Sequence, residues 1–561
     1  MFGTVRGARL KSALITLLGA GLLLLWGAGC GSLRPVTAHI PVSDARRMAV
    51  LDAIQAKFAS QAGTDLDAQN RELAAFMRTF REIEDSGVSD DSCVWGRFTD
   101  GRSLIVVNHR SSTLRSAALP RPSITRASGL PAGIRVQLLD TMGSNYAHPT
   151  EAIKGPLRDS GFTVIGEGGG GASVDNLKSP GETGILYMDA HGGKGKSRTK
   201  ERFYSIWTDT HVTEANEAAY KEDLDAHRLV YMTANASGST VETRYAFTAD
   251  FVRQYMHLSP NTLVFINACS SYDDTMRQAF LAAGAGIYFG WTQPVDDRSA
   301  YGAAIFLFDR LLGINAVEPT DNPTRPPMTM AEVVDAMAGT TYAVTHLPFD
   351  HSEGVWGPKS DAFLKGDTGS GDLTVITPSI RSIQVDKEEM TATLKGHFGS
   401  RRGTVDANGT RKAPGDELTV TSWTSTEITV EIESDTTSVI VRSDGRSSNR
   451  RLLPSENYVL SGADGGGFGV DDNLRVWWNS DLIFEDPRGA YAGYRGPFRI
   501  PGKKGDTIRI EVQDWYGYYA GYSSIYLTTP AGDVLLLEPG INKATPPGNH
   551  NIVLNKTYVL P

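Results

Sequence analysis

The sequence predicts a multidomain protein: a small α+β module, an α/β domain with a mostly parallel sheet, and two all-β domains. Three observations support this fold class. Between residues 131 and 375, short apolar runs alternate with helical stripes, which is typical of a parallel sheet with helices on both faces. From residue 376 onward the helical stripes end, and short alternating runs are separated by turn residues. The length of 561 residues suits three or four domains, and the 59 glycines and 27 prolines indicate many turns.

The first thirty residues predict export. Three basic residues come first: Arg6, Arg9 and Lys11. An apolar stretch follows, and three small residues precede Cys30. This pattern resembles a bacterial lipoprotein signal, which implies that residues 1–29 are removed and that Cys30 carries lipid in the cell envelope, on the outer membrane. An ordinary secretory signal cleaved nearby is the alternative. An uncleaved membrane anchor is disfavoured, because the apolar part is short for a membrane-spanning helix.

Residues 30–43 are expected to form a tether and residues 44–110 the α+β module. Its first helix begins at Asp44, and its second runs from about Asp65 to Gly87. Two strands follow, joined by an Asp-Gly turn: Val94–Phe98 and Ser103–Val107. The module is either a pro-region that masks an active site or a packing module. The Ser-, Arg- and Pro-rich residues 111–130 predict a linker and a candidate cleavage site.

The α/β domain, residues 131–375, is expected to contain alternating elements. Strands are predicted at 134–139, 162–165, 185–188, 203–207, 263–267 and 286–290, and helices at 149–160, 248–256, 276–283 and 303–312. Gly166 to Gly171 formally matches a dinucleotide-binding pattern. A plain glycine run satisfies that pattern trivially, so we expect a flexible loop there and no nucleotide.

Two of these strands end in residues that can carry chemistry. One apolar run ends in Asp189, Ala190 and His191, followed by two glycines, and a later one ends in Asn267, Ala268 and Cys269. The carboxyl ends of strands in open α/β sheets are where ligands collect. A thiolate is a strong nucleophile that an imidazole can activate. Taken singly, such a Cys is more often a small core residue and such a His a structural one; their pairing favours catalysis.

The two blocks, YMDAHGG and VFINACSS, resemble the His-Gly and Ala-Cys blocks of caspase-like cysteine peptidases, the clan of caspases, gingipains, clostripain, legumain and separase. The resemblance covers roughly residues 130 to 375. It implies a cysteine endopeptidase without a cofactor, with Cys269 as nucleophile and His191 as proton carrier. The backbone N–H groups of Gly192 and Cys269 would stabilise the oxyanion.

The resemblance also implies a substrate pocket lined by Asn267 and by Trp291, in the loop after a later strand. In several relatives an Asp two residues before the catalytic Cys favours basic substrates, and this chain has Asn267 there. Nearby carboxylates that could supply charge instead are Asp273, Asp274, Asp296 and Asp297. The specificity therefore stays open. Asp189 either orients neighbouring groups or caps the end of its strand.

Residues 376–455 resemble an immunoglobulin-like domain of the IPT/TIG type, on the segments TPSIRSI, GHFGS, SWTSTEITVEI and VRSDGRSSN. Residues 456–561 predict a β-sandwich rich in Gly, Trp and Tyr. Its aromatic residues are either core or a platform for glycan: Trp477, Trp478, Trp515, Tyr516, Tyr518 and Tyr519. Four carboxylates near strand ends are candidate ligands for a structural Ca²⁺: Asp471, Asp472, Asp506 and Asp514.

The composition and the cysteine spacing argue against a nucleic-acid-binding protein and against a zinc site. The net charge of −9 and the lack of a basic stripe argue against nucleic acid as a partner. The three cysteines have no zinc-ligand spacing; a Cys93–Cys269 disulfide would block the nucleophile, and we expect Cys93 to be a buried bystander. The sequence therefore predicts an exported, lipid-anchored cysteine endopeptidase that acts on a peptide or protein. The alternative is a catalytically silent caspase-fold lipoprotein that binds glycan or protein through its C-terminal domains.

Overall fold

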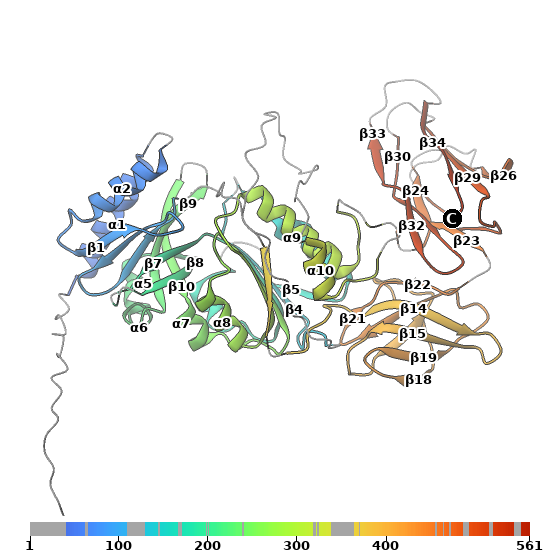
Figure 1. Ribbon diagram of the computed structural model, residues 1–561, viewed down its shortest axis with the longest axis horizontal. Coiled ribbons are helices and arrows are strands. Elements are labelled where there is room, and N and C mark those ends of the chain that lie inside the picture. Colours follow the sequence, from blue (N-terminus) through green and yellow to red (C-terminus); the bar gives the residue numbers. More distant parts are fainter. Residues whose placement is uncertain are drawn as a thin grey trace, which may run out of the picture. The chain divides into compact units, whose positions relative to one another are not determined.

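The computed structural model describes residues 41–561 with gaps (Figure 1). The residues outside the description are 1–40, 62–64, 109–128, 144–145, 166–170, 198, 200, 238–239, 318–320, 322–324, 338–363, 370, 455–456, 464, 471–472, 486–492, 515–519 and 544–550. The predicted signal and most of the tether, of the linker and of the glycine loop thus lie outside it. No helix among the described residues is long and apolar enough to cross a membrane.

A mostly parallel sheet of six strands forms the centre of the α/β domain, as predicted. Its strand order is β13-β12-β11-β6-β4-β5, and only β13 runs antiparallel. The strands are β4 (Arg135–Asp140), β5 (Thr163–Ile165), β6 (Thr183–Asp189), β11 (Thr262–Asn267), β12 (Ala285–Trp291) and β13 (Leu364–Thr368). Every residue of β6, β11 and β12 is buried, which explains their nearly continuous apolar runs.

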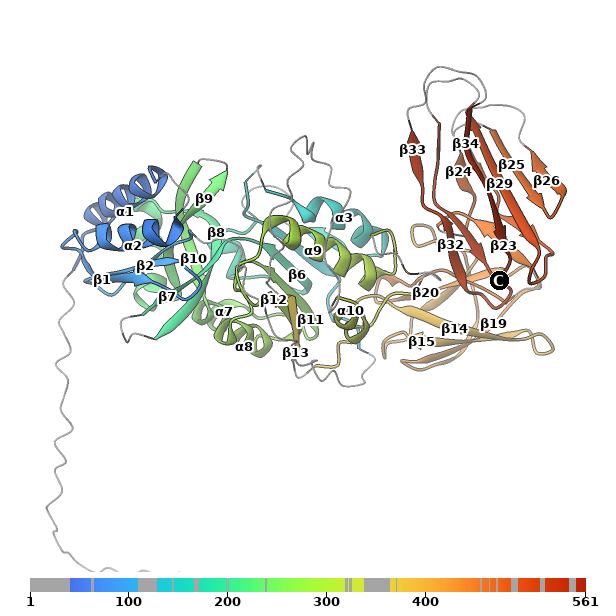
Figure 2. The same cartoon turned by 45° about the horizontal axis from the view of Figure 1, so that its top comes forward.

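Helices cover both faces of this sheet because alternate residues of each strand point to opposite sides. Leu263 and Phe265 of β11 pack with one helix group, and Val264 and Ile266 pack with the other. The first group is α3 (Pro149–Asp159), α9 (Asp297–Leu312) and α10 (Met330–Met337), and the second is α7 (Ala249–Tyr255) and α8 (Asp274–Ala282). Figure 2 shows α3 and α9 over one face and α7 and α8 over the other.

A second sheet, which the sequence analysis did not predict, has seven strands in the order β1-β2-β3-β9-β10-β8-β7. Its strands are β1 (Ile83–Val88), β2 (Val94–Phe98), β3 (Ser103–Val106), β7 (Gly192–Lys196), β8 (Arg202–His211), β9 (Leu229–Ser237) and β10 (Thr240–Thr248). Neighbouring strands are antiparallel except β3 and β9, which are parallel. The N-terminal strands therefore belong to the same sheet as the strand that follows His191.

The N-terminal helices pack on this sheet and share its core. They are α1 (Asp44–Ala59) and α2 (Leu66–Met77), with Ser43 and Asp65 as N-caps. Three shorter helices lie further along the chain: α4 (Val174–Leu177), α5 (Glu214–Ala219) and α6 (Lys221–Asp225). The predicted second helix was too long, because Ile83–Val88 pairs with β2 as strand β1. A separate α+β module is likewise not what the structure shows, since one apolar core joins α1 and α2 to β6 and β11.

Two β regions follow. Residues 379–452 form two antiparallel sheets, β14-β15-β19-β18 and β17-β16-β20-β21 with β22 beside β20, around one core. The strands are β14 (Ser379–Asp386), β15 (Thr391–His397), β16 (Thr404–Ala407), β17 (Asp416–Glu417), β18 (Val420–Trp423), β19 (Glu427–Glu431), β20 (Ser438–Ser443), β21 (Arg446–Ser447) and β22 (Arg451–Leu452). This is a β-sandwich; its membership of the IPT/TIG type stays a prediction.

The last region has three four-stranded sheets around one core, where the sequence predicted a simple sandwich. The sheets are β28-β23-β31-β32, β27-β24-β30-β33 and β26-β25-β29-β34. The strands are β23 (Tyr458–Ser461), β24 (Phe468–Val470), β25 (Asn473–Trp478), β26 (Asp481–Glu485), β27 (Gly493–Arg495), β28 (Phe498–Ile500), β29 (Thr507–Asp514), β30 (Ala520–Tyr522), β31 (Ile525–Thr528), β32 (Val534–Glu538), β33 (Ile541–Lys543) and β34 (Asn551–Val559).

Candidate active site

The register of the six-stranded sheet brings His191 and Cys269 to the same edge. Strands β6 and β11 are parallel neighbours, and Asp189 is paired with Asn267 at their ends. His191 and Cys269 each follow two residues later, and the Ala190 N–H donates to the Asn267 carbonyl at 3.4 Å. A Cβ atom on Gly192 would lie 3.0 Å from the Cys269 carbonyl oxygen. The two turns are therefore in direct contact, as their strand-end positions predicted.

A hydrogen bond to Asn235 and contacts with two aromatic rings help to orient the His191 ring. Its Nε2 atom lies 2.8 Å from the Asn235 carbonyl oxygen. Because a carbonyl can only accept, Nε2 must carry the hydrogen, which leaves Nδ1 as the basic nitrogen of the neutral ring. The Tyr146 and Trp207 rings lie at centroid distances of 5.6 Å and 5.2 Å. The imidazole is thus held in one tautomer and one orientation.

Cys269 lies in the turn after β11. Its Sγ donates to the Val295 carbonyl at 3.6 Å, which ties Cys269 to the loop after β12. The next residue, Ser270, has a left-handed backbone with φ of 56°. The Ser270 N–H donates to the Gln293 carbonyl at 3.1 Å, which ties the turn to the same loop. Cys269 is therefore on a tight turn that is bonded to the neighbouring loop.

The backbone N–H groups of Gly192 and Cys269 are the predicted oxyanion donors. The Trp207 N–H donates to the His191 carbonyl, so the pair Gly192–Ile206 is of the non-hydrogen-bonded kind. The Gly192 N–H consequently points away from β8, and β7 is the last strand in the order of this sheet. In the part of the chain that the structure describes, the Cys269 N–H donates no hydrogen bond. The role of these two groups as oxyanion donors stays a prediction.

Three carboxyl groups lie near one another at this edge of the sheet, where Asp140 is the register partner of Asp189. They are Asp140 at the end of β4, Asp189 at the end of β6 and Asp297 at the start of α9. Burial raises the pKa of Asp189 well above its usual range, and the charges of Asp140, Asp297 and Cys269 raise it further. Burial likewise raises the pKa of Asp297 to about 6. His148 Nδ1 lies 2.7 Å from Asp140 Oδ2. The sequence had pointed to Asp189 and Asp297 but had not singled out Asp140.

Asn267 and Trp291, the predicted pocket residues, are buried and bonded to each other. Their exposed fractions are 2% and 0%. The Trp291 Nε1–H donates to Asn267 Oδ1 at 2.7 Å, and Asn267 Nδ2 donates to the Tyr187 hydroxyl at 2.9 Å. Neither side chain presents a surface to a substrate, which corrects the predicted role. The neutral residue at position 267 therefore says nothing about specificity.

The structure describes only some of the other predicted site residues. Cys30, Asp471 and Asp472 lie outside the described residues, as do the side chain of Asp514 and four of the six C-terminal aromatic residues. Asp506 Oδ2 accepts from Trp478 Nε1 at 3.0 Å, and Arg509 stacks 3.6 Å from the Trp477 ring centroid. Among the described residues no group of three acidic, His or Cys side chains could hold a metal ion. Both Cys93 and Cys269 are free thiols.

Comparisons with known proteins add little to this geometry. No protein-family model matches the chain, and neither does any curated protein. A complex of the pro- and mature domains of RgpB from Porphyromonas gingivalis matches with 12% identity and a TM-score of 0.24, over 59% of this chain and 70% of that one. The arginine-specific cysteine proteinase gingipain R (RgpB) matches with 11% identity and a TM-score of 0.26, over 58% and 68%. Similarity at this level assigns no activity, so function must be argued from the residues.

Proposed function

We propose that this protein is a cysteine endopeptidase that uses Cys269 and His191. The observation that carries the proposal is the juxtaposition of their two turns at the carboxyl edge of neighbouring parallel strands. A thiol, an imidazole of fixed tautomer and nearby backbone N–H donors are what acyl transfer through a thioester needs. A structural Cys and a structural His would not require this combination.

The reaction follows from the geometry. His191 Nδ1 accepts the thiol proton, and Cys269 Sγ leaves the Val295 carbonyl to attack the scissile carbonyl carbon. The N–H groups of Gly192 and Cys269 hold the resulting oxyanion. His191 then protonates the leaving amine, and the C–N bond breaks to leave a thioester. Water, deprotonated by His191, attacks the thioester, and the product leaves as a carboxylic acid while the thiol is restored.

The test is alkylation of the purified protein by iodoacetamide, followed by intact mass over time. We expect Cys269 to label faster than buried Cys93, the rate to vanish in Cys269→Ala, and the rate to fall in His191→Ala. Hydrolysis of a peptide library by the wild type should stop in both variants. Equal rates of labelling for Cys93 and Cys269, together with no peptide hydrolysis, would contradict the proposal.

We further propose that the residue before the scissile bond is basic. Support comes from Asp140 and Asp297, two partly exposed carboxyl groups beside the buried Asp189, which a cationic side chain could approach and pair with. Peptides differing only in Arg, Lys, Asp or Ala at that position provide the test, and Asp140→Asn should reduce the preference for Arg. Equal rates for Arg and Asp peptides would contradict this specificity but leave the peptidase assignment intact.

We also propose that the protein acts at the bacterial cell envelope, anchored by lipid on Cys30. Support comes from the sequence alone, in the basic, apolar and small residues that precede Cys30. Incorporation of labelled palmitate in cells should occur in the wild type and be lost in Cys30→Ser. Release of unlabelled wild-type protein into the medium would favour the ordinary secretory signal.

A further inference from the structure

Tyr204 connects strand β8 to the turn that carries Cys269. It lies on β8, is fully buried, and its hydroxyl donates to the Cys269 carbonyl oxygen at 2.7 Å. The same hydroxyl would lie 1.8 Å from a Cβ atom on Gly192. Glycine at position 192 is thus what lets the Tyr204 hydroxyl reach Cys269, and one side chain touches both halves of the proposed active site.

A second buried tyrosine holds the same turn from the other sheet. Tyr288 lies on β12, is fully buried, and its hydroxyl donates to the Ser271 carbonyl at 2.7 Å. Ser271 Oγ in turn donates to the Ile266 carbonyl at 2.7 Å and accepts from the Trp291 N–H at 2.9 Å. Two hydroxyls from two sheets therefore fix the carbonyl groups on either side of the left-handed Ser270.

The carbonyl direction at Cys269 matters for the chemistry. A peptide group is planar, so its C=O and the following N–H point in opposite directions. Tyr204 holds the Cys269 oxygen at one end of this plane, and the Gln293 carbonyl holds the Ser270 N–H at the other. A carbonyl freed from Tyr204 could rotate about the Cα–C bond of Cys269 toward the site, where its partial negative charge would repel an oxyanion.

We infer that Tyr204 is a positioning residue for the proposed peptidase, and that its hydroxyl keeps the Cys269 peptide oriented for oxyanion stabilisation. The inference rests on the proposed function. It assigns Tyr204 no contact with the substrate, because the side chain is buried behind Gly192 and Cys269. Its hydroxyl acts only through the backbone of the nucleophile turn.

The experiment compares two reactions of Cys269 in the full chain. Iodoacetamide alkylation needs the thiolate but forms no oxyanion, whereas hydrolysis of a peptide ester or amide needs both. Tyr204→Phe removes only the hydroxyl. We expect its kcat for the best library peptide to fall by about 10- to 100-fold, with KM and the pH profile of alkylation within about twofold of wild type.

Tyr245→Phe is the matched control, since Tyr245 is a buried tyrosine of the same sheet whose hydroxyl donates to Glu217 at 3.0 Å, away from Cys269. It should leave kcat unchanged. Tyr288→Phe is the second test, and it should also lower kcat more than it lowers the rate of alkylation. This variant tests the role of the turn if Tyr204→Phe does not fold.

A kcat within twofold of wild type in Tyr204→Phe would overturn the inference, as would an equal loss of kcat and alkylation in a folded variant. If the wild type shows neither hydrolysis nor preferential labelling of Cys269, the proposed function itself fails and the inference falls with it.

Discussion

At the scale of single residues, Asp297 and Asp274 occupy the same position on two helices but differ in environment. Each is the first residue of its helix and follows an Asp N-cap. The Asp274 side chain is 80% exposed, whereas burial raises the pKa of Asp297 from 3.8 to about 6. Because the folded state binds this proton more tightly, Asp297 favours folding below pH 4, and that contribution is lost as the pH rises through 6.

We therefore expect Asp297→Asn to stabilise the protein at pH 8 by about 1–3 kcal/mol and to change little at pH 4. The free energy of unfolding, from urea denaturation at both pH values, is the measurement. Asp274→Asn is the control and should show no such dependence on pH. A stabilisation of Asp297→Asn that is equal at both pH values would show that the carboxyl is not the cause.

The sequence could predict those site residues whose place in the fold follows from their position at the end of a strand. His191 and Cys269 each end a buried apolar run, so adjacency on the sheet edge followed from the parallel topology. Tyr204 could not be found in this way, because it lies on a strand of the other sheet and reaches Cys269 only through packing. Asn267 was misjudged because its amide bonds to Trp291, a partner set by the next strand.

At the scale of elements, β7 lies tightly over the segment that begins β2. A Cβ atom on Gly193 would lie 2.8 Å from Cys93 Sγ and 3.2 Å from a methyl carbon of Ile105. Gly193→Ala should thus destabilise the protein by about 1–3 kcal/mol. Adding Cys93→Ala removes the sulfur, so the double variant should recover about 1 kcal/mol relative to the sum of the single changes.

Gly155→Ala is the control for this pair, because a Cβ atom there meets no other atom within 4 Å. It lies in α3, where Ala is favoured over Gly, and its effect should simply add to that of Cys93→Ala. Unfolding free energies of the five variants give the two coupling energies. Additivity between Cys93 and Gly193 would mean that β7 does not pack there as described.

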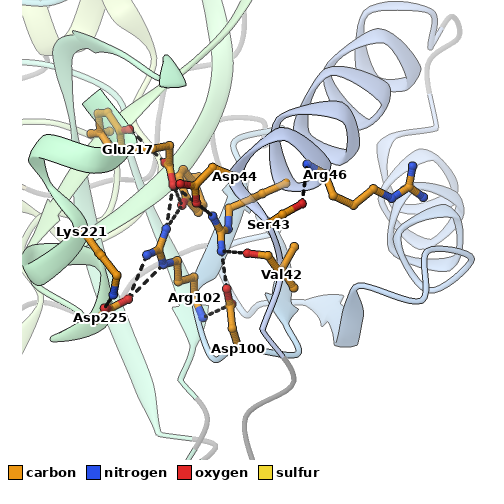
Figure 3. A network of polar contacts seen from close by, with 12 residues as sticks. Val42, Ser43, Asp44, Arg46, Asp100, Arg102, Glu217, Lys221 and Asp225 are labelled. Atoms are coloured by element: carbon orange, nitrogen blue, oxygen red, sulfur yellow. Dashed lines mark hydrogen bonds and ion pairs between the residues drawn. The ribbon is translucent and has the colours of Figure 1, made fainter. Parts of the chain in front are cut away.

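A second contact between elements is a buried ionic network that joins α1 and the β2–β3 turn to α5 (Figure 3). Glu217 on α5 is fully buried and accepts from Arg47 at 3.2 Å and from Arg102 at 2.7 Å. Tyr231 also donates to it, at 2.9 Å. Such a cluster is stable only while its charges balance.

Glu217→Gln keeps the shape of the side chain but leaves Arg47 and Arg102 without their shared counter-ion. We expect a loss of about 3–5 kcal/mol in the free energy of unfolding. Glu222→Gln is the control, because that side chain is 90% exposed and pairs with Arg228 at the surface; its effect should stay within about 0.5 kcal/mol. A loss as small as this in Glu217→Gln would show that the network does not hold the N-terminal elements.

Element types were predicted well where the apolar period was long and clear, as in α3, β6, β11 and α8. The prediction failed where the spacing of apolar residues continues a helix although the segment forms a strand. Phe80 and Ile83 continue the helical stripe of α2, yet pairing with β2 makes Ile83 the first residue of a strand. Strands β9 and β10 were missed because only the start of β9 is apolar, and its pairing with the distant β3 carries no local signal.

At the scale of the whole molecule, residues 41–108 form part of the unit that contains the proposed active site. Strands β1 to β3 make up nearly half of the seven-stranded sheet. Leu104 and Ile105 of β3 are fully buried and face two different cores. Asp91, in the turn before β2, accepts the Lys194 N–H at 3.0 Å and so fixes the strand that carries Gly192. A pro-region that leaves the enzyme would have none of these roles.

We therefore expect that residues 129–561, expressed alone, will not fold into a protein whose Cys269 labels preferentially. Expressed together with residues 41–108 as a separate chain, they should form a complex that purifies as one species and labels at the wild-type rate. The pairing of β3 with β9 and the Glu217 network supply the binding, and only the covalent link across residues 109–128 is missing. Native mass spectrometry and labelling of both preparations are the measurements. If residues 129–561 alone are folded and more reactive than the full chain, the N-terminal segment is an inhibitory pro-region after all, and its strands in the seven-stranded sheet would be the means by which it inhibits.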